Sequence, residues 1–71
     1  MRRNARLPRI LGNRIKRSRK LLKLTQEEVA AKVGISPVYM GYIEQGRNTP
    51  SLEVLEKIAR VLKVKTGELV G

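Results

Sequence analysis

Few side chains of this 71-residue chain could break a covalent bond or hold a metal ion. The sequence contains no His, Cys or Asp, so the commonest general base, the thiol nucleophile and the usual metal ligands are missing, and six Glu remain. Lys and Arg are abundant, 16 in all, and they suit the binding of phosphate and other anions. This inventory predicts a binding protein rather than an enzyme, with no metal and no cofactor.

The positive charge is concentrated in the first third of the chain. Residues 1–23 contain ten basic residues and no acidic one, whereas residues 24–71 contain six of each. The net charge of +10 therefore comes entirely from the N-terminal third. Such a segregated basic segment is typical of a protein that contacts phosphates, although a solvated, solubilising helix face would have the same composition.

The middle of the chain contains the capping and helix-ending residues expected of two short helices joined by a tight turn. Thr25 and Glu28 have the spacing of a capping box, and Ser36 followed by Pro37 is a favoured N-cap and first helical residue. Between them, Gly34 can take the left-handed conformation that ends a helix. Two helices closed by so short a turn form a helix-turn-helix, which usually places its second helix in the major groove of DNA.

Periodicity and helix-breaking residues predict one all-α domain of five helices, with the helix-turn-helix at the second and third. A basic N-terminal arm is expected over residues 1–8 and the DNA-binding domain over residues 9–71. The expected helices are Arg9–Leu22, Gln26–Val33, Pro37–Gln45, one that follows Pro50 and ends near Leu62, and a last turn containing Leu69. No apolar run is long enough to span a membrane and no signal-peptide core follows the basic N-terminus, so we expect a cytoplasmic protein.

The helical wheel of the third helix separates a core face from an open face. At about 100° per residue, Met40 and Ile43 turn inward. The residues predicted to read bases from the open face are Pro37, Val38, Gly41 and Tyr42. Gly41 lets a base or the backbone approach closely, Val38 can pack on a thymine methyl group, and Tyr42 can donate to a base edge or a phosphate. The alternative for Tyr42 is an aromatic side chain that is merely exposed.

A second set of residues is predicted to contact the DNA backbone. Gln26 begins its helix, where free N–H groups and the helix dipole favour an anion, although many first-turn residues are simply polar. Tyr39 lies at the edge of the open face, where it can pack or place its hydroxyl on a phosphate. The full set is Arg14, Arg17, Gln26, Ser36, Tyr39, Gln45, Arg47 and Asn48. For Lys16, Lys20 and Lys23, the sequence does not separate phosphate contact from solvation.

Four segments together resemble the lambda-repressor-like, or Xre-type, helix-turn-helix family, which includes phage repressors, Cro proteins and the controller proteins of restriction–modification systems. The segments are Leu24–Ala30, Gly34–Ser36, Ile43–Gly46 and Pro50–Leu52, and the similarity extends over about Leu11–Val70. The resemblance implies the fold and a DNA-binding function.

The resemblance also assigns roles to single residues. It implies that Gln26 contacts a phosphate and braces the recognition helix. It further implies that Glu44, which an adjacent phosphate would repel, pairs with an arginine of the first helix, here Arg19. We therefore expect a bidentate bridge that fixes the third helix on the first. The sequence departs from the family at Ser18, where an apolar residue is common, and at Lys23, where glycine is common.

These observations predict a sequence-specific regulator that binds double-stranded DNA, as a repressor or autoregulator. One recognition helix contacts only a few base pairs, so we expect a homodimer on a palindromic operator, with the two recognition helices about 34 Å apart. The predicted pairing surface consists of Val61, Val64, Leu69 and Val70, with closure of the domain's own core as the alternative.

Two other functions are weighed against this one. An antitoxin of a toxin–antitoxin pair would bind its operator and a protein toxin, but the sequence offers no long unstructured tail to wrap a toxin. An RNA-binding protein would fit the charge, but two Tyr provide little platform for stacking bases. No small-molecule site is evident.

Overall fold

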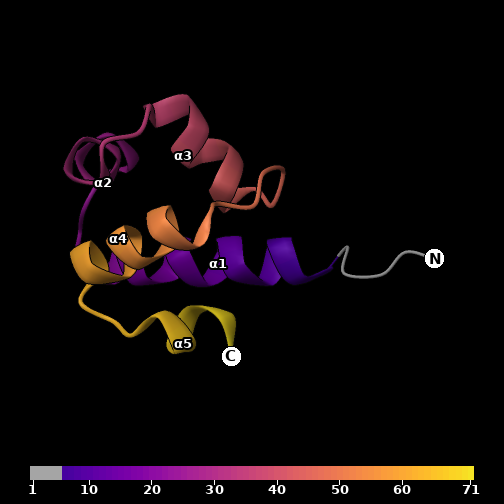
Figure 1. Ribbon diagram of the computed structural model, residues 1–71. Helices are drawn as coiled ribbons and strands as arrows, with labels where there is room; N and C mark the ends of the chain where they lie inside the picture. Colours follow the sequence, from indigo (N-terminus) through magenta and orange to yellow (C-terminus); the bar gives the residue numbers. More distant parts are fainter. Residues whose placement is uncertain (1–5) are drawn as a thin grey trace.

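Five α-helices make up the part of the chain that the computed structural model describes, residues 6–71. They are α1 (Arg6–Leu21), α2 (Gln26–Val33), α3 (Pro37–Glu44), α4 (Leu52–Leu62) and α5 (Thr66–Val70). Figure 1 shows α1 running through the middle of the molecule, with α2 and α3 on one side and α5 on the other. The prediction of an all-α domain of five helices is confirmed. None of the described helices is long and apolar enough to cross a membrane.

The first helix begins earlier than the sequence predicts. α1 starts at Arg6 instead of Arg9, so Leu7 and Pro8 belong to the helix and not to an arm. Proline is tolerated there because the first N–H groups of a helix have no intrahelical acceptor. The rest of the predicted arm, residues 1–5, lies outside the described residues.

Short-range caps begin α2 and α3 as the sequence predicts. The Thr25 hydroxyl accepts a hydrogen bond from the Glu28 N–H at 3.0 Å, and the Glu28 carboxylate accepts one from the Thr25 N–H at 2.7 Å. The Ser36 hydroxyl accepts from the N–H of Tyr39 at 3.0 Å, with Pro37 as the first helical residue. Each bond satisfies a backbone donor that the helix itself leaves free.

Four helices end on a residue in the left-handed conformation. These residues are Lys23 (φ 59°), Gly34 (φ 91°), Gly46 (φ 78°) and Lys63 (φ 62°). After each of them, the next N–H reaches back five residues, as from Leu24 to the Arg19 carbonyl at 3.1 Å and from Val64 to the Ala59 carbonyl at 3.0 Å. This is the Schellman arrangement, in which glycine is favoured because a Cβ is strained there.

The core is built from side chains of all five helices. Its largest fully buried side chains are Ile15, Val29, Met40, Ile43, Ile58, Leu62 and Leu69. The close approach of α1 to α3 requires Gly12, because an added Cβ would lie 2.6 Å from the carbonyl oxygen of Glu44. The rigid contact between these two helices therefore depends on one missing side chain.

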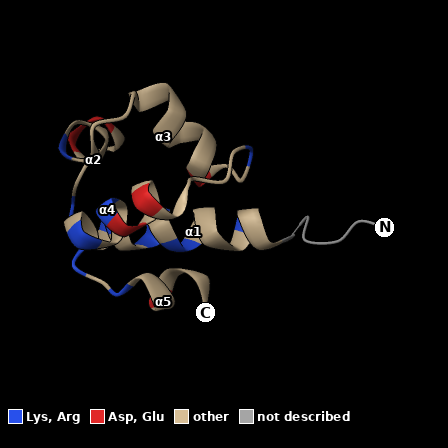
Figure 2. Cartoon of the chain, in the orientation of Figure 1, with Lys and Arg blue, Asp and Glu red and all other residues tan. Residues whose placement is uncertain are grey.

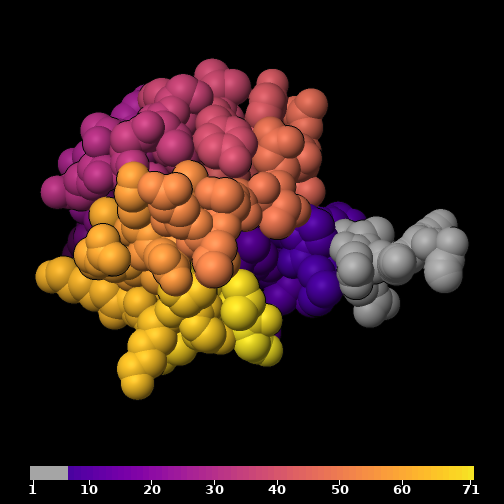
Figure 3. Space-filling view, in the orientation of Figure 1, coloured from indigo at the N-terminus to yellow at the C-terminus, as the bar shows by residue number. Residues whose placement is uncertain are grey.

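Basic residues are distributed unevenly over the helices. Figure 2 shows basic residues, in blue, on α1, on the turns and on the end of α4, whereas α3 contains none. Figure 3 shows the end of the chain, in yellow, lying against the indigo start of α1 and the orange segment that follows α3. The two ends of the described chain therefore meet at one side of the molecule, next to the loop after α3.

Candidate nucleic-acid interface

One face of α3 takes no part in the core. Pro37 and Val38 are exposed at its start, Val38 to 64%, and Gln45 is exposed just past its end. Met40 and Ile43, on the opposite side, are buried as the helical wheel predicts. The open face therefore presents apolar and uncharged polar groups, which are the groups that contact base edges and thymine methyls in a DNA groove.

Tyr42 and Arg47 form a pair at the C-terminal end of this face. The Arg47 guanidinium lies over the Tyr42 ring, with 4.3 Å between its Cζ and the ring centroid. The turn at Gly46 makes this possible, since the Arg47 N–H donates to the Tyr42 carbonyl at 2.9 Å. A cation–π contact of this kind holds the guanidinium beside α3 while its N–H groups stay free for an anion. Asn48 follows on the exposed loop.

Gly41 occupies a different environment from the one expected. It is buried, and a Cβ added to it would lie 3.6 Å from Oε1 of Gln26 and 4.0 Å from Nε2 of Gln45. The prediction that Gly41 lies open to a base is therefore wrong, because the start of α2 packs its first side chain over α3. These distances are ordinary van der Waals contacts, so the fold itself does not require glycine at this position.

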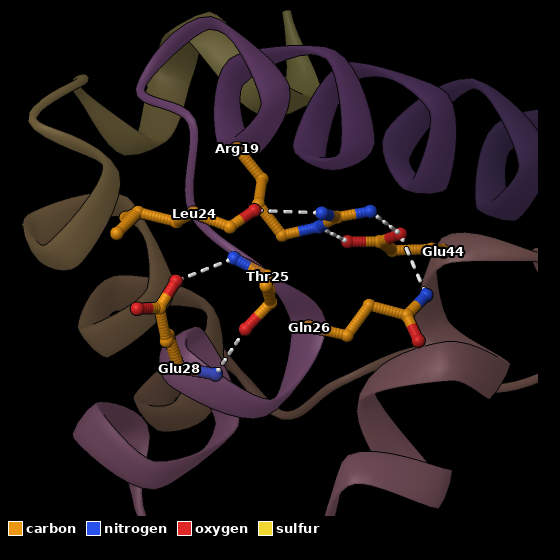
Figure 4. Close-up of polar contacts among 6 residues, drawn as sticks. All are labelled: Arg19, Leu24, Thr25, Gln26, Glu28 and Glu44. Carbon is orange, nitrogen blue, oxygen red and sulfur yellow. Dashed lines mark hydrogen bonds and ion pairs between the residues drawn. The ribbon is translucent and has the colours of Figure 1, made fainter.

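Arg19, Gln26 and Glu44 form one polar network that joins three helices (Figure 4). Arg19 Nε and Nη2 donate to the two Glu44 carboxylate oxygens at 2.6 and 2.9 Å, which is the bidentate pair expected from the sequence. Gln26 Nε2 donates to the same carboxylate at 2.9 Å, and Arg19 Nη1 donates to the Leu24 carbonyl at 2.8 Å. The bond from Gln26 to α3 agrees with the bracing role that the resemblance implies, and it identifies the Glu44 carboxylate as the acceptor.

This network is buried and electrostatically satisfied. Arg19 is 7% exposed and Glu44 4%. The hydrogen bond to Glu44 raises the pKa of Arg19 above its ordinary value, against the opposing effect of burial, so the guanidinium stays charged. The network fixes the Gln26 amide, which keeps one N–H and its carbonyl oxygen for a ligand. Phosphate contact by Gln26 stays a prediction, now with a defined orientation of the side chain.

Two other predicted phosphate contacts lie at the start of α3. Ser36 is exposed, and its hydroxyl oxygen is engaged as the helix cap, which leaves the O–H free to donate. Tyr39 is half-buried and packs against the core. Of the two possibilities left open for Tyr39, the structure shows the packing; contact between its hydroxyl and a phosphate stays a prediction.

The basic residues of α1 point in several directions. Arg14 is wrongly predicted as a phosphate contact, because its Nη1 donates to the Leu69 carbonyl of α5 at 3.3 Å, on the far side of α1 from α3. Gly12 marks the side of α1 that touches α3. Measured around the helix axis from Gly12, Arg17 lies at about 140°, whereas Lys16 and Lys20 lie at about 40° and 80°. All three side chains are exposed. The two lysines are therefore closer to α3, a placement that the register from Gly12 reveals.

Three of the four residues of the predicted pairing surface pack in or against the domain's own core. Leu69 is 1% exposed, so its assignment to a dimer interface is wrong; it closes the core against α1. Val61 and Val64 are half-buried against the same core, and of the four residues Val70 alone is exposed, to 54%.

A different apolar surface is open at the place where the chain ends meet. A groove of about 390 Å³ lies there, bordered by Leu7 at 56%, Ile10 at 40% and Val70 at 54% exposure. The remaining lining residues are Pro8, Leu11, Thr49, Pro50, Leu55 and Leu69. Sequence periodicity missed this surface because Leu7 and Pro8 were assigned to the arm.

Comparison with known proteins gives consistent results. Residues 15–69 match the family model described as Helix-turn-helix. The chain is 43% identical over 61 residues to the immunity repressor protein of Bacillus phage phi105, covering 86% of this chain but only 42% of that repressor. Among solved structures, it is similar to the restriction–modification controller protein C.AhdI from Aeromonas hydrophila, with a TM-score of 0.84 and 31% identity over 87% of this chain and 94% of that one. It is also similar to the biofilm master regulator SinR in complex with DNA, with a TM-score of 0.81 and 37% identity over 86% and 98% of the two chains.

Proposed function

Because the chain belongs to the helix-turn-helix family of DNA-binding transcriptional regulators, we propose that it regulates transcription by placing α3 in the major groove of an operator. The observation that carries this proposal is the open face of α3, which is exposed although the opposite face is fully packed. The mechanism is occupancy of the groove, and no reacting group is needed.

The base-reading set follows from the open face. Pro37 and Val38 enter the groove first, since the N-terminal part of a recognition helix contacts base edges. Val38 packs on a thymine methyl, and Tyr42 reaches a base edge with its hydroxyl while Arg47 holds its ring. Gly41 is not part of this set, because it lies under the Gln26 amide.

Backbone contacts surround this set. The free N–H groups at the starts of α2 and α3 and the side chains of Gln26 and Ser36 supply donors on one side. Gln45, Arg47 and Asn48 supply them on the other side. Lys16 and Lys20 add positive charge along the flank of α1 that neighbours α3, and they replace Arg14 in this role.

In-vitro selection from a random duplex library tests the proposal. We expect one enriched sequence that wild-type protein binds and that Val38→Ala discriminates less well. Leu52→Ala is the matched control, because Leu52 is an apolar residue of similar exposure, 65%, that lies on α4. If no sequence is enriched, or if both variants change base preference equally, α3 is not the reading helix.

We further infer that two copies bind one two-fold operator. A single α3 contacts too few base pairs to select a site, so pairing of two domains is needed for specificity. The groove bordered by Leu7, Ile10 and Val70 suits this pairing: it is apolar, exposed and adjacent to the loop that follows α3. Pairing there brings a second α3 onto the same stretch of duplex.

Analytical ultracentrifugation with and without the selected duplex tests the pairing. Val70→Glu is expected to reduce the stoichiometry on DNA from two chains to one and to weaken binding. Leu21→Glu, at a residue that is 76% exposed and far from this groove along α1, is the control. A non-palindromic site bound by one chain, insensitive to Val70→Glu, contradicts the dimer but leaves the role of α3 intact.

A further inference from the structure

A second groove, of about 430 Å³, lies between the turn after α1 and the end of α4. We call it the α1–α4 groove. Leu22, Leu24 and Val61 form its apolar floor, and Lys32, Arg60 and Lys63 stand around it. Leu22 is 38% exposed, and Leu21, which precedes it in the chain, is 76% exposed. None of these lining residues is acidic, so the groove combines an apolar base with a positive rim.

The rim charges have no ionic partner among the residues that the structure describes. Over residues 7–71 the ion pairs are Arg19–Glu44 and Lys57–Glu53, which leave the three cations of the rim without a carboxylate within 4.0 Å. Glu28 precedes Lys32 by one helical turn but its carboxylate accepts the Thr25 N–H. Residues 24–71 contain equal numbers of basic and acidic residues, but the surface around this groove carries a net positive charge.

One of the two lysines in the left-handed conformation lines this groove, and the other is next to its floor in the chain. Lys63 lines it, and Lys23 lies between two floor residues, Leu22 and Leu24. The other two helix ends of this kind use glycine, at Gly34 and Gly46, where no Cβ is strained. Lysine at these two positions lowers the stability of the fold, because its Cβ is strained in the left-handed conformation. Strained backbone conformations of this kind cluster at functional sites.

The groove faces away from the DNA-reading surface. No residue of α3 lines it. Lys32 follows Gln26 by six residues, about 240° around α2, so it lies on the flank of α2 away from the network with Glu44. Neither Tyr39 nor Tyr42 is near enough to line the groove, so it offers no aromatic platform for bases. A ligand here can bind while α3 occupies DNA.

We propose that the α1–α4 groove binds an acidic amphipathic helix of a partner protein, with apolar side chains on the floor and carboxylates on the lysine rim. Helices dock into grooves through a row of apolar residues at helical spacing, and the charge of this rim selects acidic flanks. A nucleic-acid backbone would use the cations but not the leucines. This contact goes beyond operator binding, because it links the DNA-bound domain to a second protein.

A designed peptide provides the test without knowledge of the natural partner. The probe is a fluorescein-labelled peptide of roughly four helical turns with Leu at heptad spacing and Glu elsewhere. Its control replaces each Leu by Ser. Titration into ¹⁵N-labelled protein is expected to shift the amide signals of residues 21–24, 32 and 60–63, and to leave those of α3 in place.

The two lysines separate binding from folding. Lys23→Gly/Lys63→Gly removes one rim charge, that of Lys63, a second cation next to the floor in the chain, and two strained conformations. We therefore expect about three- to tenfold weaker peptide binding together with a higher melting temperature. Lys57→Gln, which removes an exposed lysine of α4 outside the groove, is expected to change neither binding nor the site of the shifts. Binding of the selected duplex by the double glycine variant is measured in parallel.

Three results would overturn the proposal. One is the absence of peptide binding at millimolar concentration, and another is equal binding of the Leu→Ser peptide, which would reduce the groove to a generic cationic surface. The third is a double glycine variant that loses duplex binding but keeps peptide binding, because the lysines would then serve DNA. None of these results changes the test of α3 by selection, so the two proposals fail separately.

Discussion

Removal of the Glu44 carboxylate is expected to destabilise the domain more than any single change on the DNA-reading face. Glu44→Ala leaves Arg19, which is 7% exposed, as a buried charge without its bidentate partner, and Gln26 loses its acceptor. Breaking one side of a buried pair costs about 3–5 kcal/mol. The lower value applies here, because Arg19 keeps its bond to the Leu24 carbonyl and its long side chain can turn toward water.

That loss is large for so small a domain. A chain of this size has a free energy of unfolding of roughly 4–11 kcal/mol, and each kcal/mol lowers the melting temperature by about 4–8 °C. We therefore expect Glu44→Ala to melt at least about 12 °C below wild type, as followed by circular dichroism at 222 nm, the helical band. Gln26→Ala, which removes one hydrogen bond of a half-buried side chain, is expected to cost only about 1 kcal/mol.

A double variant distinguishes the lost partner from lost packing. Arg19→Met/Glu44→Leu replaces both charges by apolar groups of similar size, and such replacements are often neutral or stabilising. It is therefore expected to recover most of the stability that Glu44→Ala loses. If Glu44→Ala melts within about 2 °C of wild type, or if the double variant is as unstable as the single one, the network does not hold α3 on α1 in the way described.

Further predictions concern glycines, helix ends, Tyr42 and salt. Gly12→Ala is expected to lower the melting temperature sharply, because its Cβ would lie 2.6 Å from the Glu44 carbonyl oxygen. Gly41→Ala has room, with its nearest neighbour at 3.6 Å, and should stabilise α3 by about 0.5–1 kcal/mol, so equal melting of the two variants would contradict this packing. Lys23→Gly and Lys63→Gly should each raise the free energy of unfolding by about 0.5–1 kcal/mol in chemical denaturation, and a decrease would show that neither helix end is strained. Tyr42→Phe keeps the ring under Arg47 and should keep the fold, but it should lose about 1–3 kcal/mol of discrimination if the hydroxyl reads a base, measured by competition between operator variants. The logarithm of duplex affinity should fall linearly with the logarithm of salt concentration, with a slope corresponding to about six to ten phosphates for a dimer, and Lys16→Gln should reduce that slope where Arg17→Gln does not.

The elements could be predicted because their signals are local. The capping box of Thr25 and Glu28, the Ser36–Pro37 start and the Gly34 turn each involve residues at most five positions apart, so a short stretch of sequence contains both partners of every interaction. The start of α1 was missed by three residues because a proline fits the first turn of a helix as well as it fits the residue before one. The Arg19–Glu44 pair, 25 residues apart, was found only through the family pattern.

The neighbours of each side chain could not be predicted in the same way. Periodicity indicates on which side of a helix a residue lies, but it does not indicate which other element covers that side. Arg14 contacts a carbonyl 55 residues away, Gln26 covers Gly41, and Leu69 fills the core in place of a partner subunit. The sequence by itself determined the five helices, the caps of α2 and α3 and the excess of positive charge. The tertiary structure decided which cations stay free, which apolar residues stay open and where the two lysine-capped helix ends meet, because each of these depends on the packing of helices that are distant in sequence.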